Sequence, residues 1–318
     1  MKILVTGGMG YIGSHIILQL IGNGHTVISI DNNCRSIKNA RDTIGEMTGI
    51  YIKNFEVDLS KEILINDQLN NIDCIIHCAG YKSVGESKQF PAMYYQNNID
   101  STLNVLKMME IYNIKNLIFS SSCTVYGSHL HPVTEKTKTG DCESPYGWSK
   151  WMQEQILKDV CISHPDYSII SLRYFNPIGS FTHLSDISKT NLLPNIVDVM
   201  FGKIDKLKVY GHDYITRDGT CVRDYIHVSD LARAHVGMIN YMNNHKGYDV
   251  FNVGTGIGFT VLDVITKFEE VNQVKINWEY ADRRSGDAAI AYSHSNKIRH
   301  AINWKPSYNL ADMVNLQI

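Results

Sequence analysis

A glycine-rich turn near the N-terminus constrains the fold of this chain more than any other feature of its 318 residues. The apolar run Lys2–Thr6 has the pattern of a buried strand and enters a turn with Gly7, Gly10 and Gly13, after which apolar residues recur at helical spacing over residues 12–20. These glycines permit a tight turn, close approach of the backbone to a pyrophosphate, and close packing of helix on strand. We therefore expect a dinucleotide site here, although a turn without a ligand has the same composition.

A second apolar run, Thr26–Ile30, ends at Asp31, about 20 residues after the turn. An acidic residue at this point can accept a hydrogen bond from a ribose 2′-hydroxyl. Its charge repels a 2′-phosphate, so Asp31 favours NAD over NADP. Arg35 follows four residues later, and because a nearby arginine can accept that phosphate, it weakens the preference slightly. We interpret Arg35 as a solvated surface charge.

The most informative chemistry lies in the pair Tyr146 and Lys150. Ser144 suits a helix N-cap and Pro145 the first helical position, so a helix is expected to begin here with the phenol and the amine on one face. A free phenol has a pKa of about 10, and half ionisation near pH 7 requires a fall of roughly 3 units, about 4 kcal/mol. A cation about 6 Å away supplies roughly 3 kcal/mol at an effective dielectric constant of about 20.

Lys150 alone therefore falls short of making Tyr146 a base at neutral pH, and the positive charge of an oxidised nicotinamide ring would close the difference. The plain alternative is an exposed pair on a helix surface, because this spacing recurs on helices without function.

Strand and helix patterns alternate along the first half of the chain. Expected strands cover residues 2–6, 26–30, 51–57, 74–78, 116–120 and 168–174, with helices over 12–20, from about 60, over 91–112 and from 145. This alternation predicts the α/β class: a doubly wound, mainly parallel (Rossmann) sheet with helices on both faces. Ligands in such sheets bind outside the carboxyl ends of the strands.

The pattern loosens after Asn176, where we expect a smaller α/β substrate-binding lobe packed over the ligand edge of the sheet. Its expected elements are helices over 192–200, from 229 and from 260, and strands over 208–210 and 250–253. The predicted division is a dinucleotide-binding domain at 1–175 and the substrate lobe at 176–318, with chain segments that can interleave.

Charge and cysteine content narrow the class of protein. The 30 Lys and Arg nearly balance the 32 Asp and Glu without a block of like charge, which argues against nucleic-acid and membrane-surface partners. No apolar run reaches the length of a membrane span, and the chain opens in a strand rather than a signal peptide. Seven cysteines without CxxC spacing predict reduced thiols and a cytoplasmic protein. Cys74, His77 and Cys78 lack a second ligand pair, so we expect no metal.

Several segments together resemble the extended short-chain dehydrogenase/reductases, and within them the UDP-galactose 4-epimerase group over almost the whole chain. The segments that carry the resemblance are residues 5–15, 77–80, 119–127, 144–150, 172–177, 222–228 and 283–287. The resemblance implies NAD held tightly through turnover, with Tyr146 as base, Lys150 lowering its pKa and binding the nicotinamide ribose, and Ser122 on the sugar 4-hydroxyl. It further implies reversible oxidation of a UDP-hexose at C4 through a transient 4-keto sugar.

The same resemblance implies two sets of binding residues. Further contacts to NAD are expected from Gly7, Gly10, Tyr11, Ile12, Gly13, Asp31, Asn32, Cys34, Ser36, Asp58, Leu59, Ala79, Gly80, Lys82, Asn97, Ser122 and Phe175. Contacts to the nucleotide sugar are expected from Ser122, Tyr146, Asn176, Asn191, Leu192, Tyr210, Arg223, Arg284, Asp287 and Ala291. In this second set the two arginines can form bidentate bonds with a diphosphate.

A few sequence positions distinguish this reaction from those of related enzymes. Dehydratases and uronate decarboxylases of this family carry extra carboxyl groups after the active-site serine, where this chain has Cys123 and Thr124. Ala291 falls at a position of the family's sugar pocket where the side chain is large in some members and small in others. Its methyl group leaves room for an N-acetyl group. Two alternative functions remain: a dehydrogenase that releases reduced cofactor, and a non-catalytic NAD-binding regulator.

The resemblance also bears on assembly and on the end of the chain. Relatives usually pair through two long helices, here near 91–112 and 145–164, so a homodimer is expected. The chain stops at Ile318, about a helix earlier than many relatives, which puts the last surface helix in doubt but not the active site.

Overall fold

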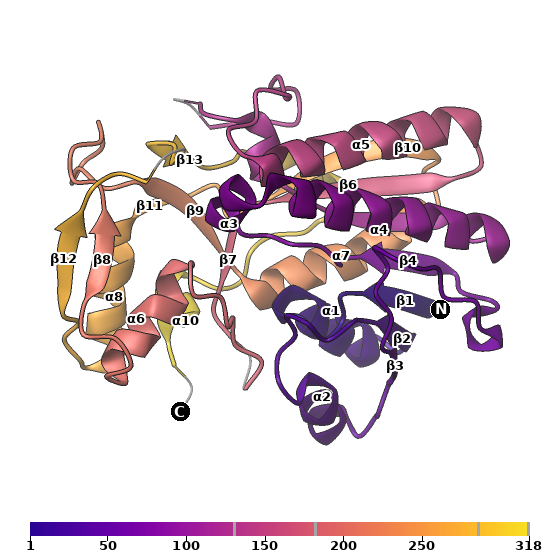
Figure 1. Ribbon diagram of the computed structural model, residues 1–318, viewed down its shortest axis with the longest axis horizontal. Coiled ribbons are helices and arrows are strands. Elements are labelled where there is room, and N and C mark those ends of the chain that lie inside the picture. The colour runs from indigo at the N-terminus through magenta and orange to yellow at the C-terminus, as the bar shows by residue number, and fades with distance from the viewer. Residues whose placement is uncertain (130–131, 181–182, 285–286, 317–318) are drawn as a thin grey trace.

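A seven-stranded parallel sheet forms the larger part of the molecule (Figure 1). The computed structural model describes residues 1–129, 132–180, 183–284 and 287–316. The strand order is β10-β6-β5-β4-β1-β2-β3, and every neighbouring pair is parallel. The strands are β1 (Lys2–Thr6), β2 (Thr26–Ile30), β3 (Lys53–Phe55), β4 (Cys74–His77), β5 (Asn116–Ser122), β6 (Ser168–Tyr174) and β10 (Gly247–Val253).

Helices cover both faces of this sheet because alternate side chains of its strands are apolar on both sides. Ile3 and Val5 of β1 pack in one buried cluster, and Leu4 between them packs in another. The first cluster takes in α1 (Tyr11–Gly22), α2 (Ala40–Thr48) and α7 (Val228–Met242), and the second takes in α4 (Pro91–Ile111) and α5 (Pro145–Ser163). The doubly wound α/β fold predicted from the sequence is confirmed.

The smaller lobe lies beyond the carboxyl ends of these strands (Figure 1). One of its sheets has the order β11-β9-β13 with β7 paired to β9, and the other joins β8 to β12. Its strands are β7 (Asn176–Ile178), β8 (Leu207–Tyr210), β9 (Val222–His227), β11 (Gly258–Thr260), β12 (Trp278–Ala281) and β13 (Ile290–Ala291). The remaining helices are α3 (Val84–Gln89), α6 (Leu192–Met200), α8 (Val261–Asn272), α9 (Asn296–Ile302) and α10 (Leu310–Val314), with 3-10 turns η1 (Asp67–Leu69) and η2 (Cys123–Tyr126).

Two elements that we expected in the smaller lobe belong to the large sheet instead. Strand β10 pairs with β6 over its full length, and α7 packs on α1. Phe251 and Val253 of β10 are apolar and fully buried in the core of the large sheet. Strand β10 also covers the edge of β6, which would otherwise be exposed. The chain therefore interleaves between the two parts, while the division at residue 175 stays a prediction.

The helix expected from about residue 60 is absent; the described residues 60–66 form a turn and an irregular segment. The Asp58 carboxylate accepts the N–H and the hydroxyl of Ser60, and the Asn66 N–H donates to the Tyr112 hydroxyl at 2.7 Å. The bond to Tyr112 engages a backbone N–H that a helix through residue 66 would need for its own hydrogen bond. Several short elements, among them α2, α3 and β9, were not expected from the sequence.

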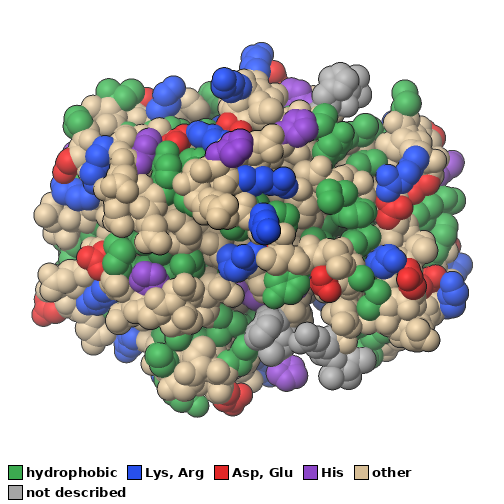
Figure 2. Space-filling view, turned by 180° about the vertical axis from the view of Figure 1, so that it is seen from behind, with side chains coloured by type: hydrophobic (Ala, Val, Ile, Leu, Met, Phe, Trp, Pro, Cys, Tyr) green, Lys and Arg blue, Asp and Glu red, His purple; other side chains and the backbone are tan. Residues whose placement is uncertain are grey.

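The surface carries charges of both signs, and Figure 2 shows them interspersed over one face of the molecule. In the part of the chain that the structure describes, no helix is both long and apolar enough to cross a membrane.

A buried ion pair fixes α5 on the large sheet. Glu154 of α5 and Arg173 of β6 are 1% and 5% exposed, and the guanidinium donates to both carboxylate oxygens at 2.9 and 2.5 Å. The same carboxylate accepts the Ser121 hydroxyl, and Arg173 also donates to the hydroxyl of Tyr126. One charged pair therefore ties α5, β5, β6 and η2 together.

Replacing Arg173 with methionine leaves the Glu154 carboxylate buried without its cation. We expect the free energy of unfolding to fall by about 3–5 kcal/mol, measured by urea denaturation. The double variant Glu154→Leu/Arg173→Met removes both charges and should recover most of that loss. As a control, Lys138→Met breaks an exposed pair with Asp141 and should change stability by less than about 1 kcal/mol. A single variant as stable as the wild type would contradict the prediction.

Candidate active site

The glycine turn leaves no room for side chains between β1, α1 and the end of β4. Gly7 has φ +70°, and a Cβ on it would come within 2.7 Å of the Ala79 nitrogen. A Cβ on Gly13 would overlap the Gly7 carbonyl, and one on Gly10 would lie 3.3 Å from the same oxygen. The turn is thus a bare backbone surface at the N-terminus of α1, and this arrangement fits the pyrophosphate of a dinucleotide.

Asp31 stands at the carboxyl end of β2, with its carboxylate held from three sides. It accepts hydrogen bonds from the N–H groups of Met9 and Asn33, both at 2.9 Å, and from the Ser36 hydroxyl at 2.7 Å. The side chain is only 9% exposed, so its orientation is fixed. These bonds place a carboxylate beside the glycine turn, where the adenosine ribose of a dinucleotide belongs.

The other residues expected to contact NAD gather along the same edge of the sheet. Two of them, Tyr11 and Ile12, begin α1, and Asn97 lies in α4. The others follow strands: Asn32, Cys34 and Ser36 after β2; Asp58 and Leu59 after β3; Ala79, Gly80 and Lys82 after β4; and Phe175 after β6. This grouping follows from the parallel sheet, since its strands all end on one side.

Asn98 was missed by sequence reasoning, although its neighbour Asn97 was named. Asn98 is fully buried and holds the turn after β4: its Oδ1 accepts the Tyr81 N–H at 2.7 Å, and its Nδ2 donates to the Tyr81 carbonyl and to the Ser149 hydroxyl. The amide thereby fixes Gly80 and Lys82 on either side of Tyr81. The sequence gives no way to tell which asparagine of the pair points inward.

Ser122, Tyr146 and Lys150 are brought together as expected. Ser122 ends β5 and Tyr146 lies in the first turn of α5, where the Ser144 hydroxyl caps the helix by accepting the Gly147 N–H at 3.1 Å. The Ser122 hydroxyl is close enough to the Tyr146 phenol to lower its pKa by hydrogen bonding, and it accepts the N–H and the hydroxyl of Thr124 at 3.2 and 3.0 Å. Lys150 lies one turn deeper, and its Nζ donates to the carbonyl of residue 120 at 2.8 Å.

Burial dominates the electrostatics of this pair. It raises the pKa of Tyr146 to about 12, and the hydrogen bond to Ser122 offsets this only in part. Burial also lowers the pKa of Lys150 from 10.5 to about 8. The expected fall in the pKa of Tyr146 is therefore absent in the protein by itself. The difference from a pKa of about 7 is roughly 5 units, or about 7 kcal/mol, which exceeds what one lysine supplies.

Five residues expected at the nucleotide sugar form a second cluster. The Asp287 carboxylate lies 2.9 Å from Nε of Arg284 and 3.6 Å from a terminal nitrogen of Arg223. The Arg284 guanidinium lies 4.7 Å from the centre of the Tyr210 ring. Ala291 pairs with Arg223 between β13 and β9. Ser285 and Gly286, which complete this motif, lie outside the described residues.

Asp186, which the sequence analysis did not single out, bridges the two sets of residues. Its carboxylate accepts a hydrogen bond from Lys82 at 3.1 Å on the cofactor side. On the other side it accepts one from Asn191 at 2.6 Å, and Asn191 and Leu192 begin α6. Asn176 lies apart from this bridge and donates to the carbonyl of residue 224 at 3.3 Å. No motif marks Asp186, because its partner on the cofactor side, Lys82, lies 104 residues away in the sequence.

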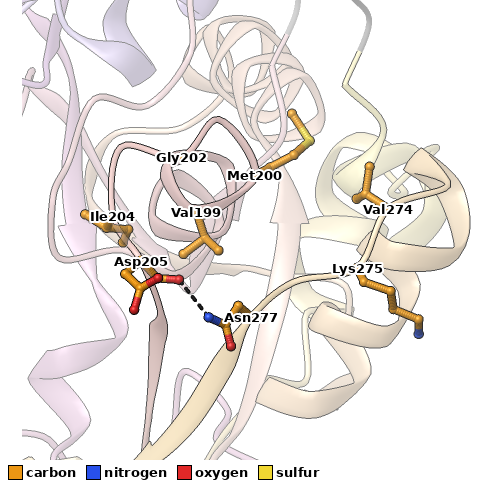
Figure 3. A pocket seen from close by; sticks show the side chains of 8 residues that line it. All are labelled: Val199, Met200, Gly202, Ile204, Asp205, Val274, Lys275 and Asn277. Atoms are coloured by element: carbon orange, nitrogen blue, oxygen red, sulfur yellow. Dashed lines mark hydrogen bonds between the residues drawn. The ribbon is translucent and has the colours of Figure 1, made fainter.

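A cavity of about 620 Å³ opens elsewhere, in the smaller lobe (Figure 3). Its lining residues come from the end of α6 and from the segment between α8 and β12: Val199, Met200, Gly202, Ile204, Asp205, Val274, Lys275 and Asn277. None of them is a residue expected at the site. Among the described residues, no group of three or more His, Cys, Asp or Glu side chains is arranged to hold a metal ion.

The lowered pKa of Lys150 predicts how the stability of the cofactor-free protein depends on pH. Between pH 8 and 10.5 the unfolded chain binds this proton and the folded chain releases it, so the free energy of unfolding rises with pH in this window. We expect the wild type to gain stability over that window relative to Lys150→Met, as measured by urea unfolding at several pH values. Parallel curves for the two proteins would show that the amine is not destabilised by burial.

Comparison with known proteins identifies the family of this chain. Residues 3–254 match the model of the NAD dependent epimerase/dehydratase family. A UDP-glucose 4-epimerase from Pasteurella multocida (strain Pm70) is 42% identical over 324 residues, which cover 99% of this chain and 95% of that protein.

Two crystal structures of UDP-glucose 4-epimerases share the fold closely. The enzyme from Bifidobacterium longum, in complex with NAD+ and UDP, has a TM-score of 0.93 at 42% identity and covers 99% of this chain and 96% of its own. The enzyme from Stenotrophomonas maltophila, with bound NAD and formylated UDP-arabinopyranose, has a TM-score of 0.93 at 36% identity, with the same two coverages. With its bare glycine turn, its Ser–Tyr–Lys group and a family match over most of its length, this chain belongs to the NAD dependent epimerase/dehydratase family.

Proposed function

We propose that this protein is a UDP-glucose 4-epimerase that interconverts UDP-galactose and UDP-glucose with bound NAD. The observation that carries the proposal is that Ser122, Tyr146 and Lys150 come together at the end of β5, at the same sheet edge as the glycine turn. The likeness to UDP-glucose 4-epimerases over 99% of the chain supports the choice of reaction.

The proposed roles follow from the positions of the side chains. Held by the bare glycine turn and Asp31, NAD would supply reversible hydride transfer at the sugar C4 and a positive charge beside Tyr146. Tyr146 takes the proton of the 4-hydroxyl and gives it back, and Ser122 orients that hydroxyl. Lys150 supplies the neighbouring cation and binds the nicotinamide ribose. Because the hydride returns to the sugar, turnover needs no exchange of cofactor.

The arginine cluster is proposed to bind the UDP diphosphate. In the protein alone, Asp287 is the carboxylate between Arg223 and Arg284. A diphosphate presents more oxygens than a carboxylate and matches the forked donors of both guanidinium groups. The Tyr210 ring lies beside the Arg284 guanidinium. The remaining NAD and sugar contacts expected from the sequence are proposed on the same basis, their place at the ligand edge.

The position after Ser122 disfavours elimination chemistry. Cys123 and Thr124 stand where a dehydratase would carry an acid and a base, and burial raises the pKa of the Cys123 thiol to about 12. A neutral thiol and a hydroxyl cannot replace two carboxyl groups at neutral pH. A dehydrogenase that releases reduced cofactor is the second candidate, because it would use the same Tyr146 and Lys150.

The assembly and the location are also proposals. Helices α4 and α5 pack side by side and expose Leu103 and Ile162, and we propose that they form a homodimer interface. All seven cysteines are free thiols, which supports a reducing, cytoplasmic environment.

Tyr146→Phe tests the proposed base. Loss of the phenolic oxygen should lower the rate of UDP-glucose formation from UDP-galactose by at least about 100-fold, in a coupled assay without added NAD. Tyr280→Phe, in the smaller lobe, should keep the wild-type rate. An unchanged rate in Tyr146→Phe would exclude its role, and steady accumulation of NADH by the wild type would point to a dehydrogenase instead.

Ala291 tests the sugar specificity. We propose that its small side chain admits N-acetylated hexosamines, so the wild type should epimerise UDP-N-acetylgalactosamine as well as UDP-galactose. Ala291→Tyr should lose roughly 10-fold or more of the turnover of the acetylated sugar while keeping that of UDP-galactose. Rejection of UDP-N-acetylgalactosamine by the wild type would refute this proposal.

A further inference from the structure

The loop after β2 carries two charged side chains that are held in different directions. The Asp31 carboxylate points to the glycine turn, where it accepts the Met9 N–H. Ser36 is tied to the same carboxylate by its hydroxyl at 2.7 Å, so the loop is anchored at both ends. Arg35 lies between these anchors, next to the place of the adenosine ribose, but its guanidinium is bonded to another element.

That partner is Glu86 in α3, 51 residues away in the sequence. The two terminal nitrogens of Arg35 donate to the two carboxylate oxygens of Glu86 at 2.6 and 2.9 Å, a bidentate pair. The guanidinium also lies 3.8 Å from the centre of the Tyr81 ring. The bond with Arg35 lowers the pKa of Glu86, so this carboxylate is ionised at neutral pH.

Glu86 is itself held in position, which makes the pair more than a chance surface contact. Its carboxylate accepts the Tyr94 hydroxyl at 2.6 Å, and its N–H donates to the Ser83 hydroxyl at 3.3 Å. Arg35 is therefore fixed by a carboxylate in the plane of its guanidinium and by a ring against its face. Arg35 is exposed, as the sequence suggested, and its guanidinium is also engaged by these two groups.

An arginine beside the adenosine ribose is the group that accepts a 2′-phosphate in NADP-dependent proteins of this architecture. Arg35 occupies such a position along the chain, but its guanidinium is directed to Glu86 instead. Acceptance of a 2′-phosphate would require the guanidinium to leave both Glu86 and the Tyr81 ring.

We propose that Glu86 is a positioning residue for cofactor choice: it holds Arg35 away from the ribose and so excludes NADP together with Asp31. Asp31 repels the 2′-phosphate directly, and Glu86 withholds the cation that would neutralise it. The inference concerns the adenosine end of the cofactor and is independent of the sugar chemistry.

The test uses two probes that differ only in the 2′-phosphate, ADP-ribose and 2′-phospho-ADP-ribose, titrated into the full chain freed of nucleotide. Dissociation constants are measured by calorimetry and thermal shift. Glu86→Gln should tighten binding of the phosphorylated probe by about three- to ten-fold and leave ADP-ribose unchanged, because the pair is partly exposed and worth about 1 kcal/mol.

Two further variants identify the cause. Glu86→Gln/Arg35→Gln should lose the whole gain, since the freed guanidinium is what binds the phosphate. Glu279→Gln breaks a comparable exposed pair with Lys206 in the smaller lobe and changes the net charge equally, so it should leave both constants unchanged.

The proposal is overturned by either of two results. In the first, Glu86→Gln leaves the ratio of the two constants unaltered; if both probes are then weakened equally, the pair only holds the loop in place. In the second, the double variant keeps the gain.

Discussion

The site depends on the close approach of three backbone segments at the glycine turn. Gly7 touches the backbone after β4, and Gly13 brings α1 against the turn itself, so neither position has room for a Cβ. This contact sets the first strand, the first helix and the end of β4 at a common point. Parallel pairing then brings the carboxyl ends of β5 and β6 to the same edge. Backbone geometry therefore determines where the cofactor surface and Ser122 lie.

Helix α5 connects stability with chemistry. The Ser144 cap and Pro145 fix where it begins, so Tyr146 stands in its first turn and faces the end of β5. Four residues after Lys150, Glu154 anchors the helix to Arg173 of β6 through a buried ion pair. Such a pair contributes little net stability against an apolar replacement, but it fixes one register of the helix on the sheet. The phenol and the amine are held in that register, where the amine is buried, the phenol is half-buried, and both lose hydration.

The smaller lobe has its own anchor in Asp224, beside Arg223 in β9. Its carboxylate is fully buried and accepts bonds from Thr255, from the Gly256 N–H, and from the hydroxyl and N–H of Ser293. These partners follow β10 and β13, so one side chain joins the large sheet to the strands that carry Arg223 and Ala291. Burial raises the pKa of Asp224, and the hydrogen bonds from Thr255, Ser293 and Gly256 offset this in part.

The sequence alone determined the features that depend on neighbouring residues: the glycine turn with its strand and helix, the alternation that makes a doubly wound sheet, and the start of α5 at Ser144 and Pro145. It also marked Tyr146, Lys150 and Asp31, because their chemistry shows in local motifs. Only the tertiary structure decided that β10 returns to the large sheet, that Asp186 joins Lys82 to Asn191, and that burial raises the pKa of Tyr146. Each of these depends on groups distant along the chain, and desolvation is a property of the whole surroundings of a group, which no local pattern contains.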